Sequence, residues 1–336
     1  MSGDFSSLPI IDVSALVTRS GDATKTADQI ALACRRAGFF YITGHGVSEA
    51  LQSQLEDLSR DFFSLPADVK LSIDMSKGGK AWRGYFPIGG ELTSGKPDLK
   101  EGLYFGQELS SDHPLVRSGA PMHGPNLFPA GNPLFRETVL EYLEAMTKLG
   151  HALTEGIALS LGLERSYFAD RYTGAPLILF RIFHYPAATQ AERESRSWGV
   201  GEHTDYGLLT ILKQDETGGL EVKSRTGWVE AMPVPGSFVC NIGDMLDRMT
   251  GGIYRSTPHR VKSPINHDRL SFPFFFDPNF NSEVQPIELG SRVNDDRDER
   301  WDHASVHEFS GTYGEYLLGK VARVFPQLRR EGDGVR

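Results

Sequence analysis

The sequence predicts a mixed α/β fold in which a double-stranded β-helix, or jelly roll, forms the core and helices flank it. The first half of the chain contains amphipathic helical patterns, and from Leu177 onward short β-rich runs alternate with Gly and Pro. Closely spaced short strands bounded by turns favour two facing sheets. With 336 residues, 39% hydrophobic and 24% charged, the chain can bury a substantial core without a metal or disulfide.

The N-terminal region predicts two helices with a buried strand between them. Asp22 can cap a first helix that ends at Gly38, and residues 39–42 then read as a strand. A second helix starts at Ser48. The expected buried positions of the two helices are Ala27, Ile30, Ala31 and Cys34, followed by Leu51, Leu55, Leu58 and Phe62.

Residues 75–130 are rich in Gly, Pro and charge without clear periodicity, which predicts long ordered loops of the kind that often carry function. Asn132 and Pro133 then begin the strongest helical pattern, which runs to Gly162. We therefore expect residues 1–130 to form a helical and loop region packed on the core. Residues 131–336 are expected to form the jelly-roll region, and the two parts to make one compact unit.

The remaining chain predicts the strands of the jelly roll and a last helix. The site is expected at the mouth of the two sheets, and a helix over residues 313–324 is expected to pack outside. The predicted strands are Leu177–His184, Leu208–Lys213, Leu220–Val222, Trp228–Ala231, Ser237–Ile242 and Leu270–Phe276.

Composition and charge exclude several function classes. The formal net charge of −9 and a pI near 5.6, without a Lys/Arg run, argue against nucleic acid as a partner. Cys34 and Cys240 both lie in apolar segments, where free cysteines behave as small buried hydrophobes. The first residues lack a signal-peptide pattern, and no stretch has the roughly 18 consecutive apolar residues that a membrane span needs. No membrane partner and a cytoplasmic location are the resulting expectations.

The motif His203-Thr204-Asp205, followed by His259 after 53 intervening residues, carries the main functional signal. Residues i and i+2 of an extended chain project to the same side, so His203 and Asp205 can bind one ion. Two imidazoles and one carboxylate form the facial triad of non-haem Fe(II) oxygenases, which leaves three coordination positions open. A single H-x-D is weak evidence, because a surface His near an Asp is usually only solvated.

Arg269 and Ser271 share one face of an apolar strand that begins ten residues after His259. A guanidinium offers a planar, two-pronged donor to a carboxylate, and a neighbouring hydroxyl can satisfy a remaining oxygen. An arbitrary Arg is more often part of a surface ion pair. In a strand this apolar a lone buried cation would be costly, so the pair predicts an anchor for a dicarboxylic acid.

These motifs stand in an order that resembles the isopenicillin N synthase-like family of the Fe(II)/2-oxoglutarate-dependent dioxygenases, and the resemblance spans nearly the whole chain. Many ordered matches are far more specific than any single motif. The matching segments are Leu8–Asp12, Ala37–Phe40, Gly44–Val47, Gly201–Thr210, Gly227–Val229, Pro235–Ser237, Asn241–Asp244, Ser256–Val261 and Phe274–Asn279.

The resemblance implies the site residues and the cofactors. His203, Asp205 and His259 would bind Fe(II), and Arg269 and Ser271 would hold the distal carboxylate of 2-oxoglutarate. Tyr185, which precedes Pro186, would assist near this cosubstrate. O2 is the further reactant, and ascorbate is an additional candidate. Plant relatives usually read Asn-Tyr-Tyr-Pro where this chain has Phe-His-Tyr-Pro at 183–186, which puts some detail of cosubstrate seating in doubt.

The implied function is oxidation of a small molecule by hydroxylation, desaturation or ring closure, with release of succinate and CO2. The alternative within the same fold is a non-haem iron oxidase that does not consume 2-oxoglutarate, of the isopenicillin N synthase or aminocyclopropane-carboxylate oxidase type. A catalytically silent small-molecule receptor is a third class. The complete triad argues against it.

Two weaker candidates concern the substrate. Arg83, within Trp-Arg-Gly-Tyr at 82–85, resembles the arginine that binds a substrate carboxylate in isopenicillin N synthase, and a loop anchor is the alternative. Tyr206 follows the metal motif directly, so it is expected to form an active-site wall or to be a packed aromatic.

For four further polar residues, a structural role is weighed against a functional one. His45 lies between glycines in a predicted turn, which favours a structural role. His184 is expected to turn away from the pocket by strand alternation. Asn241 and Asp244 could steer the metal ligands through hydrogen bonds. The expected role of these two is to close the turn after their strand.

Overall fold

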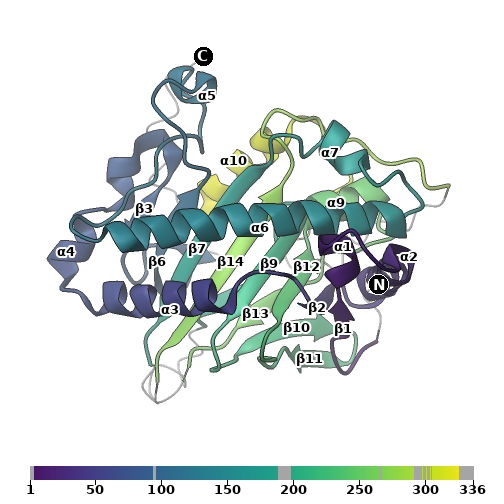
Figure 1. Ribbon diagram of the computed structural model, residues 1–336, viewed down its shortest axis with the longest axis horizontal. Coiled ribbons are helices and arrows are strands. Elements are labelled where there is room, and N and C mark those ends of the chain that lie inside the picture. Colours follow the sequence, from purple (N-terminus) through teal and green to yellow (C-terminus); the bar gives the residue numbers. More distant parts are fainter. Residues whose placement is uncertain are drawn as a thin grey trace.

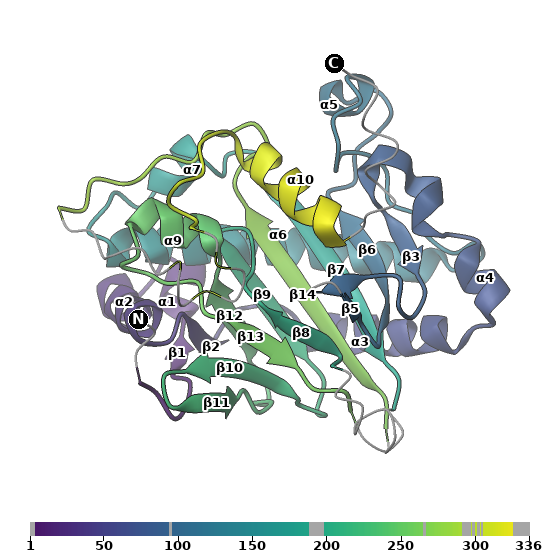
Figure 2. The same ribbon diagram turned by 180° about the vertical axis from the view of Figure 1, so that it is seen from behind.

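Two β-sheets face each other in the computed structural model, which describes residues 4–93, 96–187, 198–264, 267–290, 297, 300, 303 and 305–324 (Figure 1, Figure 2). The larger sheet is antiparallel except for its first strand pair. Its eight strands are, in spatial order, β1 (Ile10–Asp12), β2 (Phe39–Thr43), β12 (Phe238–Ile242), β9 (Leu209–Gln214), β14 (Arg269–Asp277), β7 (Leu177–Tyr185), β6 (Glu101–Gly106) and β3 (Gly84–Phe86).

The smaller sheet is antiparallel and packs on the inner face of the larger one. Figure 2 shows it in front of the larger sheet, near β12 and β9. Its strands are β11 (Gly227–Glu230), β10 (Leu220–Ser224), β13 (His259–Val261) and β8 (Val200–His203), in that order. The mixed α/β jelly-roll class that the sequence predicts is thereby confirmed.

Helices cover the outer face of the larger sheet (Figure 1). The longest is α6 (Pro133–Ser160), which packs on β14 and β9 and is flanked by α2 (Ala23–Arg36) and α3 (Glu49–Ser64). The predicted caps are present, because the side chains of Asp22, Ser48 and Asn132 each accept a hydrogen bond from the backbone N–H three residues later. Shorter helices are α1 (Ser14–Val17), α4 (Ala67–Leu71) and α7 (Tyr167–Arg171).

The region 75–130 corrects the prediction of long loops. It contains a 3-10 helix, η1 (Met75–Ala81), a small hairpin of β4 (Leu92–Thr93) and β5 (Lys96–Pro97), the strands β3 and β6, and the helix α5 (Pro114–Arg117). Strand β6 pairs with β7 inside the larger sheet, and all its residues are buried. A strand covered on both faces shows no alternation of polar and apolar residues, so periodicity cannot reveal it.

Outside this region the sequence prediction also missed β1, the short helices α1, α4 and α7, and three elements near the site, two of which carry metal-ligand candidates. Strands β8 and β13 are short and polar, and they become regular through pairing with each other. The helix α9 (Asp244–Thr250) follows β12 directly, where a turn was expected. The other predicted strands are present within one or two residues.

The last helix, α10 (Tyr313–Val324), has the predicted range but a different place. It was expected outside the jelly roll, and it lies over the inner side of β14, where Tyr313, Leu317 and Val321 line the pocket (Figure 2). These residues are four positions apart, so they form one apolar stripe of the helix. Within the described ranges, no helix combines the length and apolarity that crossing a membrane requires.

Candidate active site

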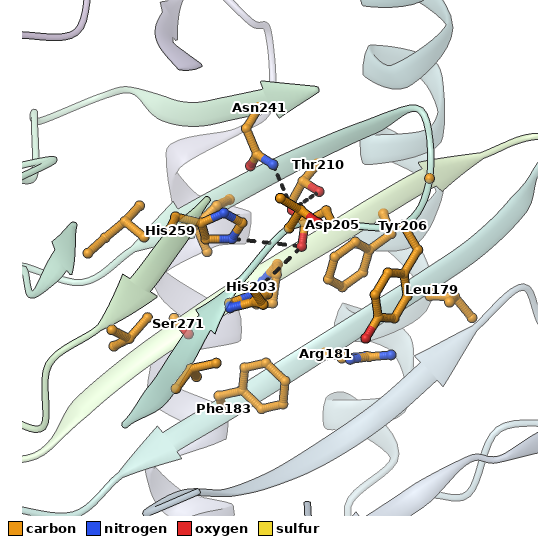
Figure 3. Close-up of a pocket in the computed structure, with 18 of the residues that line it drawn as sticks. Leu179, Arg181, Phe183, His203, Asp205, Tyr206, Thr210, Asn241, His259 and Ser271 are labelled. Atoms are coloured by element: carbon orange, nitrogen blue, oxygen red, sulfur yellow. Dashed lines mark hydrogen bonds and ion pairs between the residues drawn. The ribbon is translucent and has the colours of Figure 1, made fainter. Parts of the chain in front are cut away.

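Strands β8 and β13 of the smaller sheet bring His203 and His259 together with Asp205, which follows β8, in the wall of the inner cavity (Figure 3). His203 ends β8 and is the register partner of His259 at the start of β13. One ligand atom of each residue lies within 4.8 Å of the others. The Oδ1 atom of Asp205 is 3.9 Å from Nε2 of His203 and 3.8 Å from Nε2 of His259.

Hydrogen bonds orient all three candidate ligands toward a common point. Nδ1 of His203 donates to the carbonyl of Gly201 at 2.8 Å, and Nδ1 of His259 donates to that of Thr257 at 3.2 Å. Each ring therefore keeps the lone pair of its Nε2 atom for a metal ion, the usual arrangement for ligating histidines.

The carboxylate of Asp205 is held from its other side. Its Oδ2 atom accepts hydrogen bonds from Oγ1 of Thr210 at 2.6 Å and from Nδ2 of Asn241 at 2.7 Å, as Figure 3 shows. Oδ1 is left facing the two imidazoles. Asn241 therefore supports a metal-ligand candidate, and the expectation that it closes a turn was wrong. Its side chain comes from the middle of the larger sheet.

Electrostatics favour the protonation states that a cation requires. Burial, together with the charge on His203, lowers the pKa of His259 to about 4, so this imidazole is neutral at pH 7. Burial alone would raise the pKa of Asp205, but the two histidines and the two hydrogen-bond donors lower it below its usual value. Two imidazoles and one carboxylate, with one side open to the cavity, suit a divalent transition metal such as Fe(II).

The cavity continues from this cluster along the inner face of the larger sheet. Alternate residues of β7 and β14 form its floor, since successive side chains of a strand point to opposite faces. The floor residues are Leu179, Arg181, Phe183 and Tyr185 from β7, and Arg269, Ser271, Pro273, Phe275 and Asp277 from β14.

Arg269 lies at the end of this floor near β13 and is 1% exposed. Its Nε atom donates to the carbonyl of Gly218 at 2.6 Å, and its guanidinium lies 4.8 Å from the ring centre of Tyr185. In the described part of the chain, neither terminal nitrogen has a hydrogen-bond acceptor. Ser271 is buried on the same face. Such a buried two-pronged donor fits a carboxylate.

The two weaker substrate candidates, Tyr206 and Arg83, differ in whether they line the pocket. Tyr206 lines the pocket, as an active-site wall would. Arg83 does not line it: this guanidinium is 2% exposed, packs against Gly106 and donates to the carbonyl of Met122 at 2.8 Å. These contacts fit the loop-anchor alternative, and they correct the expectation that Arg83 binds substrate.

His45 and His184 both have structural roles outside the metal-ligand cluster. Nδ1 of His45 accepts a hydrogen bond from the backbone N–H of Val47, and its ring lies beside Phe238. His184 turns away from the pocket and bonds two carboxylates, at 2.8 and 3.0 Å. Burial alone would lower the pKa of His184, but these carboxylates, Glu101 and Asp268, raise it above its usual value.

Asp244 begins α9 and does not close a turn, which corrects that expectation. Its carboxylate pairs with Arg300 at 2.6 Å and accepts a hydrogen bond from the hydroxyl of Tyr316 at 2.7 Å. This buried cluster joins α9 to the C-terminal helix. Asp244 therefore acts on the packing of α10.

Sequence reasoning missed four acidic or basic residues that line the pocket: Glu91, Lys100, Arg181 and Asp277. A signal was available for Arg181, because it lies four residues before Tyr185 in an apolar strand and thus on the same face. Glu91 and Lys100 come from the region that was expected to be irregular. Nothing in their local sequence indicates where they point.

Two protein-family models match the chain, one described as the N-terminal part of a non-haem dioxygenase in morphine synthesis, over residues 8–131, and one as the 2OG-Fe(II) oxygenase superfamily, over residues 177–278. A probable iron/ascorbate oxidoreductase of Dictyostelium discoideum is 51% identical over 96% of each chain. A 1-aminocyclopropane-1-carboxylate oxidase of Dictyostelium mucoroides is 39% identical over 99% of each.

A solved structure has the same arrangement of elements. It is the crystal structure of a full-length Neurospora crassa protein in complex with alpha-KG (2-oxoglutarate) and 5-formyluracil, and it superimposes with a TM-score of 0.77. It is 28% identical, and the match covers 94% of this chain and 96% of that one.

Proposed function

The chain belongs to the 2OG-Fe(II) oxygenase superfamily, and from that premise we propose that it oxidises a small molecule while converting 2-oxoglutarate to succinate and CO2. One observation carries the proposal. A cluster of three metal-ligand candidates shares one pocket with a buried guanidinium whose terminal nitrogens have no acceptor among the described residues.

We assign His203, Asp205 and His259 as the iron ligands. Their fit to the ion is supported by the two Nδ1–H donations to backbone carbonyls, which leave both Nε2 atoms available. It is also supported by the carboxylate oxygen that faces the imidazoles at 3.8–3.9 Å. Bound Fe(II), together with 2-oxoglutarate and O2, supplies the oxidising chemistry.

We assign Arg269, Ser271 and Tyr185 to the cosubstrate. A guanidinium holds a carboxylate through two parallel N–H donors, and the hydroxyl of Ser271 on the same face can donate to a remaining oxygen. Tyr185 packs against the guanidinium and limits its movement. The chain thus fixes one end of a dicarboxylic acid and turns the other end toward the metal ligands.

The substrate is proposed to be a small molecule that enters between Tyr206, the floor of the larger sheet and α10. The apolar stripe of α10 excludes water from this space, which protects a reactive oxidant from side reactions. Hydroxylation, desaturation and ring closure all start from the same removal of a substrate hydrogen. The position of the substrate carbon relative to the iron ligands decides between them.

The alternative is an oxidase of the same fold that does not consume 2-oxoglutarate. It is favoured by the relative named as a 1-aminocyclopropane-1-carboxylate oxidase, which is 39% identical over 99% of each chain. Its reaction would consume O2 with substrate and release no succinate.

The test is to measure succinate and O2 consumption with Fe(II) and 2-oxoglutarate, first alone and then with a panel of metabolites. We expect succinate in step with O2, loss of turnover in a folded His203→Ala variant, and normal turnover in His267→Ala, which removes an exposed imidazole outside the pocket. Substrate-dependent O2 uptake without succinate would establish the alternative. Turnover by His203→Ala without bound iron would refute both.

A further inference from the structure

A second arginine, Arg181, lies at the other end of the pocket from Arg269. Both face the cavity, from neighbouring strands. Arg269 is paired in register with Tyr185, and Arg181 is four residues before Tyr185, so the two arginines are separated by about 13 Å along the strand direction. Figure 3 shows Arg181 beside Tyr206, with Ser271 on the opposite side of His203.

The guanidinium of Arg181 is held in place by aromatic rings and not by hydrogen bonds. It lies 4.1 Å from the ring centre of Tyr104 and 5.1 Å from that of Phe275, so both neighbouring strands of the sheet support it. Its side chain is only 15% exposed. Packing of this kind fixes the plane of the guanidinium and leaves its N–H groups to the cavity.

None of the residues that the structure describes accepts a hydrogen bond from the side chain of Arg181. Its nearest carboxylate oxygen, Oε1 of Glu91, is 3.7 Å from Nη1, and its buried Nε atom has no acceptor. A buried donor without an acceptor is unfavourable, so a ligand that supplies an acceptor is favoured there. Arg269 has the same property and is assigned to the cosubstrate carboxylate. Arg83, which is buried outside the pocket, donates to a backbone carbonyl through Nη2, although its Nε atom likewise has no acceptor among the described residues.

The carboxylate of Glu91 is already engaged by other groups. Oε1 accepts a hydrogen bond from the hydroxyl of Tyr104 at 2.7 Å, and Oε2 pairs with Nζ of Lys100 at 2.9 Å. Lys100 also donates to Asp98, and it lies 4.8 Å from the ring centre of Phe183. Glu91 thus serves two cations, Lys100 and Arg181. Both cations line the cavity.

Asp277 is the other acidic residue at this end of the pocket. Its two oxygens accept hydrogen bonds from the hydroxyl of Tyr313 at 2.5 Å and from the backbone N–H of Leu208 at 3.3 Å. Among the described residues, neither oxygen accepts a hydrogen bond from Arg181. Burial raises the pKa of Asp277, although the charge of this guanidinium acts in the opposite direction. The pocket also contains apolar side chains, among them Leu179 and Phe183, which flank Arg181 on β7, and Leu317 from α10. The phenol ring of Tyr206 lies beside Arg181 (Figure 3).

From this arrangement we propose that Arg181 binds the carboxylate of the prime substrate, and that the substrate is a small monocarboxylic acid with an apolar carbon skeleton. The inference rests on the proposed function, because it concerns the substrate end of the same pocket. The two arginines then hold two different acids, the cosubstrate near β13 and the substrate near β6. The carbon to be oxidised lies between the substrate carboxylate and the iron ligands.

The experiment uses the full chain with Fe(II) and 2-oxoglutarate, and a panel of aliphatic and aryl-substituted monocarboxylic acids, each beside its primary amide. Succinate formation reports substrate-stimulated turnover. We expect acids to stimulate turnover and their amides to fail. For the best acid, Arg181→Gln should raise the KM about 30-fold or more, because a buried carboxylate loses its charged partner.

Two matched variants separate recognition from folding. Arg181→Lys keeps the charge and should recover part of the affinity for the acid, whereas a merely structural arginine would show no such rescue. Arg136→Gln removes an arginine that is 48% exposed and lies outside the pocket, and its KM should equal that of the wild type. Melting temperatures identify any variant that does not fold.

The inference is overturned if the amides stimulate turnover as well as the acids do, if no acid does, or if folded Arg181→Gln has the wild-type KM for the best acid. Failure of the proposed function has a different signature. In that case the wild-type protein itself shows no 2-oxoglutarate binding in a titration without substrate. If the wild type binds 2-oxoglutarate and Arg181→Gln has an unchanged KM for the acid, only the substrate inference is refuted.

Discussion

Replacement of Arg269 by Ala should weaken 2-oxoglutarate binding more than any other single change at the cosubstrate end of the pocket. The side chain is 1% exposed. Neither terminal guanidinium nitrogen has a hydrogen-bond acceptor among the residues that the structure describes, so both can bind a ligand. Loss of one partner of a buried charge pair costs about 2–5 kcal/mol. This corresponds to a dissociation constant about 30- to 5,000-fold higher, since 1.4 kcal/mol is tenfold.

The assay is anaerobic calorimetric titration of the Mn(II)-loaded protein with 2-oxoglutarate. Arg269→Lys should fall between wild type and Arg269→Ala, because an ammonium keeps the charge but loses the two-pronged geometry. The variant also loses the hydrogen bond to Gly218, so its melting temperature must show that it is folded. A folded Arg269→Ala protein whose dissociation constant stays within about threefold of wild type would refute the assignment.

Three further predictions concern the metal site, pH and packing. Asn241→Ala removes a donor to the triad carboxylate and should lower Fe(II) affinity about 10- to 100-fold in chelator competition; unchanged affinity contradicts this role. The pKa of His184 is raised in the folded state, so its stabilisation is present below about pH 6.5 and is lost as pH rises through the folded pKa. His184→Phe should therefore lose more stability in urea at about pH 6 than at about pH 9, and equal losses would argue against the effect. In Gly150→Val, the added Cβ overlaps the ring of Phe276, which should cost about 1–3 kcal/mol in urea unfolding, whereas Gly319→Ala, with nothing within 4 Å, should not destabilise.

The elements that could be predicted from sequence are those whose local residue pattern corresponds directly to their surroundings in the fold. The helix that starts at Pro133 has a cap, a proline at its first turn and a regular apolar stripe, so its limits are readable. Strand β6 is buried on both faces and lies in a Gly- and Pro-rich region, so neither alternation nor propensity indicates it. Its place depends on pairing with β7, which is more than 70 residues away in the chain.

The same distinction separates the site residues that could be predicted from those that could not. His203, Asp205 and Arg269 could be predicted because each has its functional partner two residues away in the sequence. Arg269 and Ser271 share a face of β14, whereas Asp205 lies just beyond the end of β8. Asn241 was misjudged, since its role depends on a cross-strand neighbour and not on the turn beside it. The position of Arg181 on the pocket face could have been predicted from its spacing to Tyr185, whereas only the packed sheet reveals that its side chain has no hydrogen-bond acceptor in the described chain.

The most direct test of the account is a crystal structure of the protein with Mn(II) and 2-oxoglutarate, in which anomalous scattering locates the metal. We expect one strong anomalous peak between Nε2 of His203, Oδ1 of Asp205 and Nε2 of His259, with the distal carboxylate of 2-oxoglutarate on the guanidinium of Arg269. A metal peak elsewhere, or a cosubstrate carboxylate that does not contact Arg269, would contradict the account.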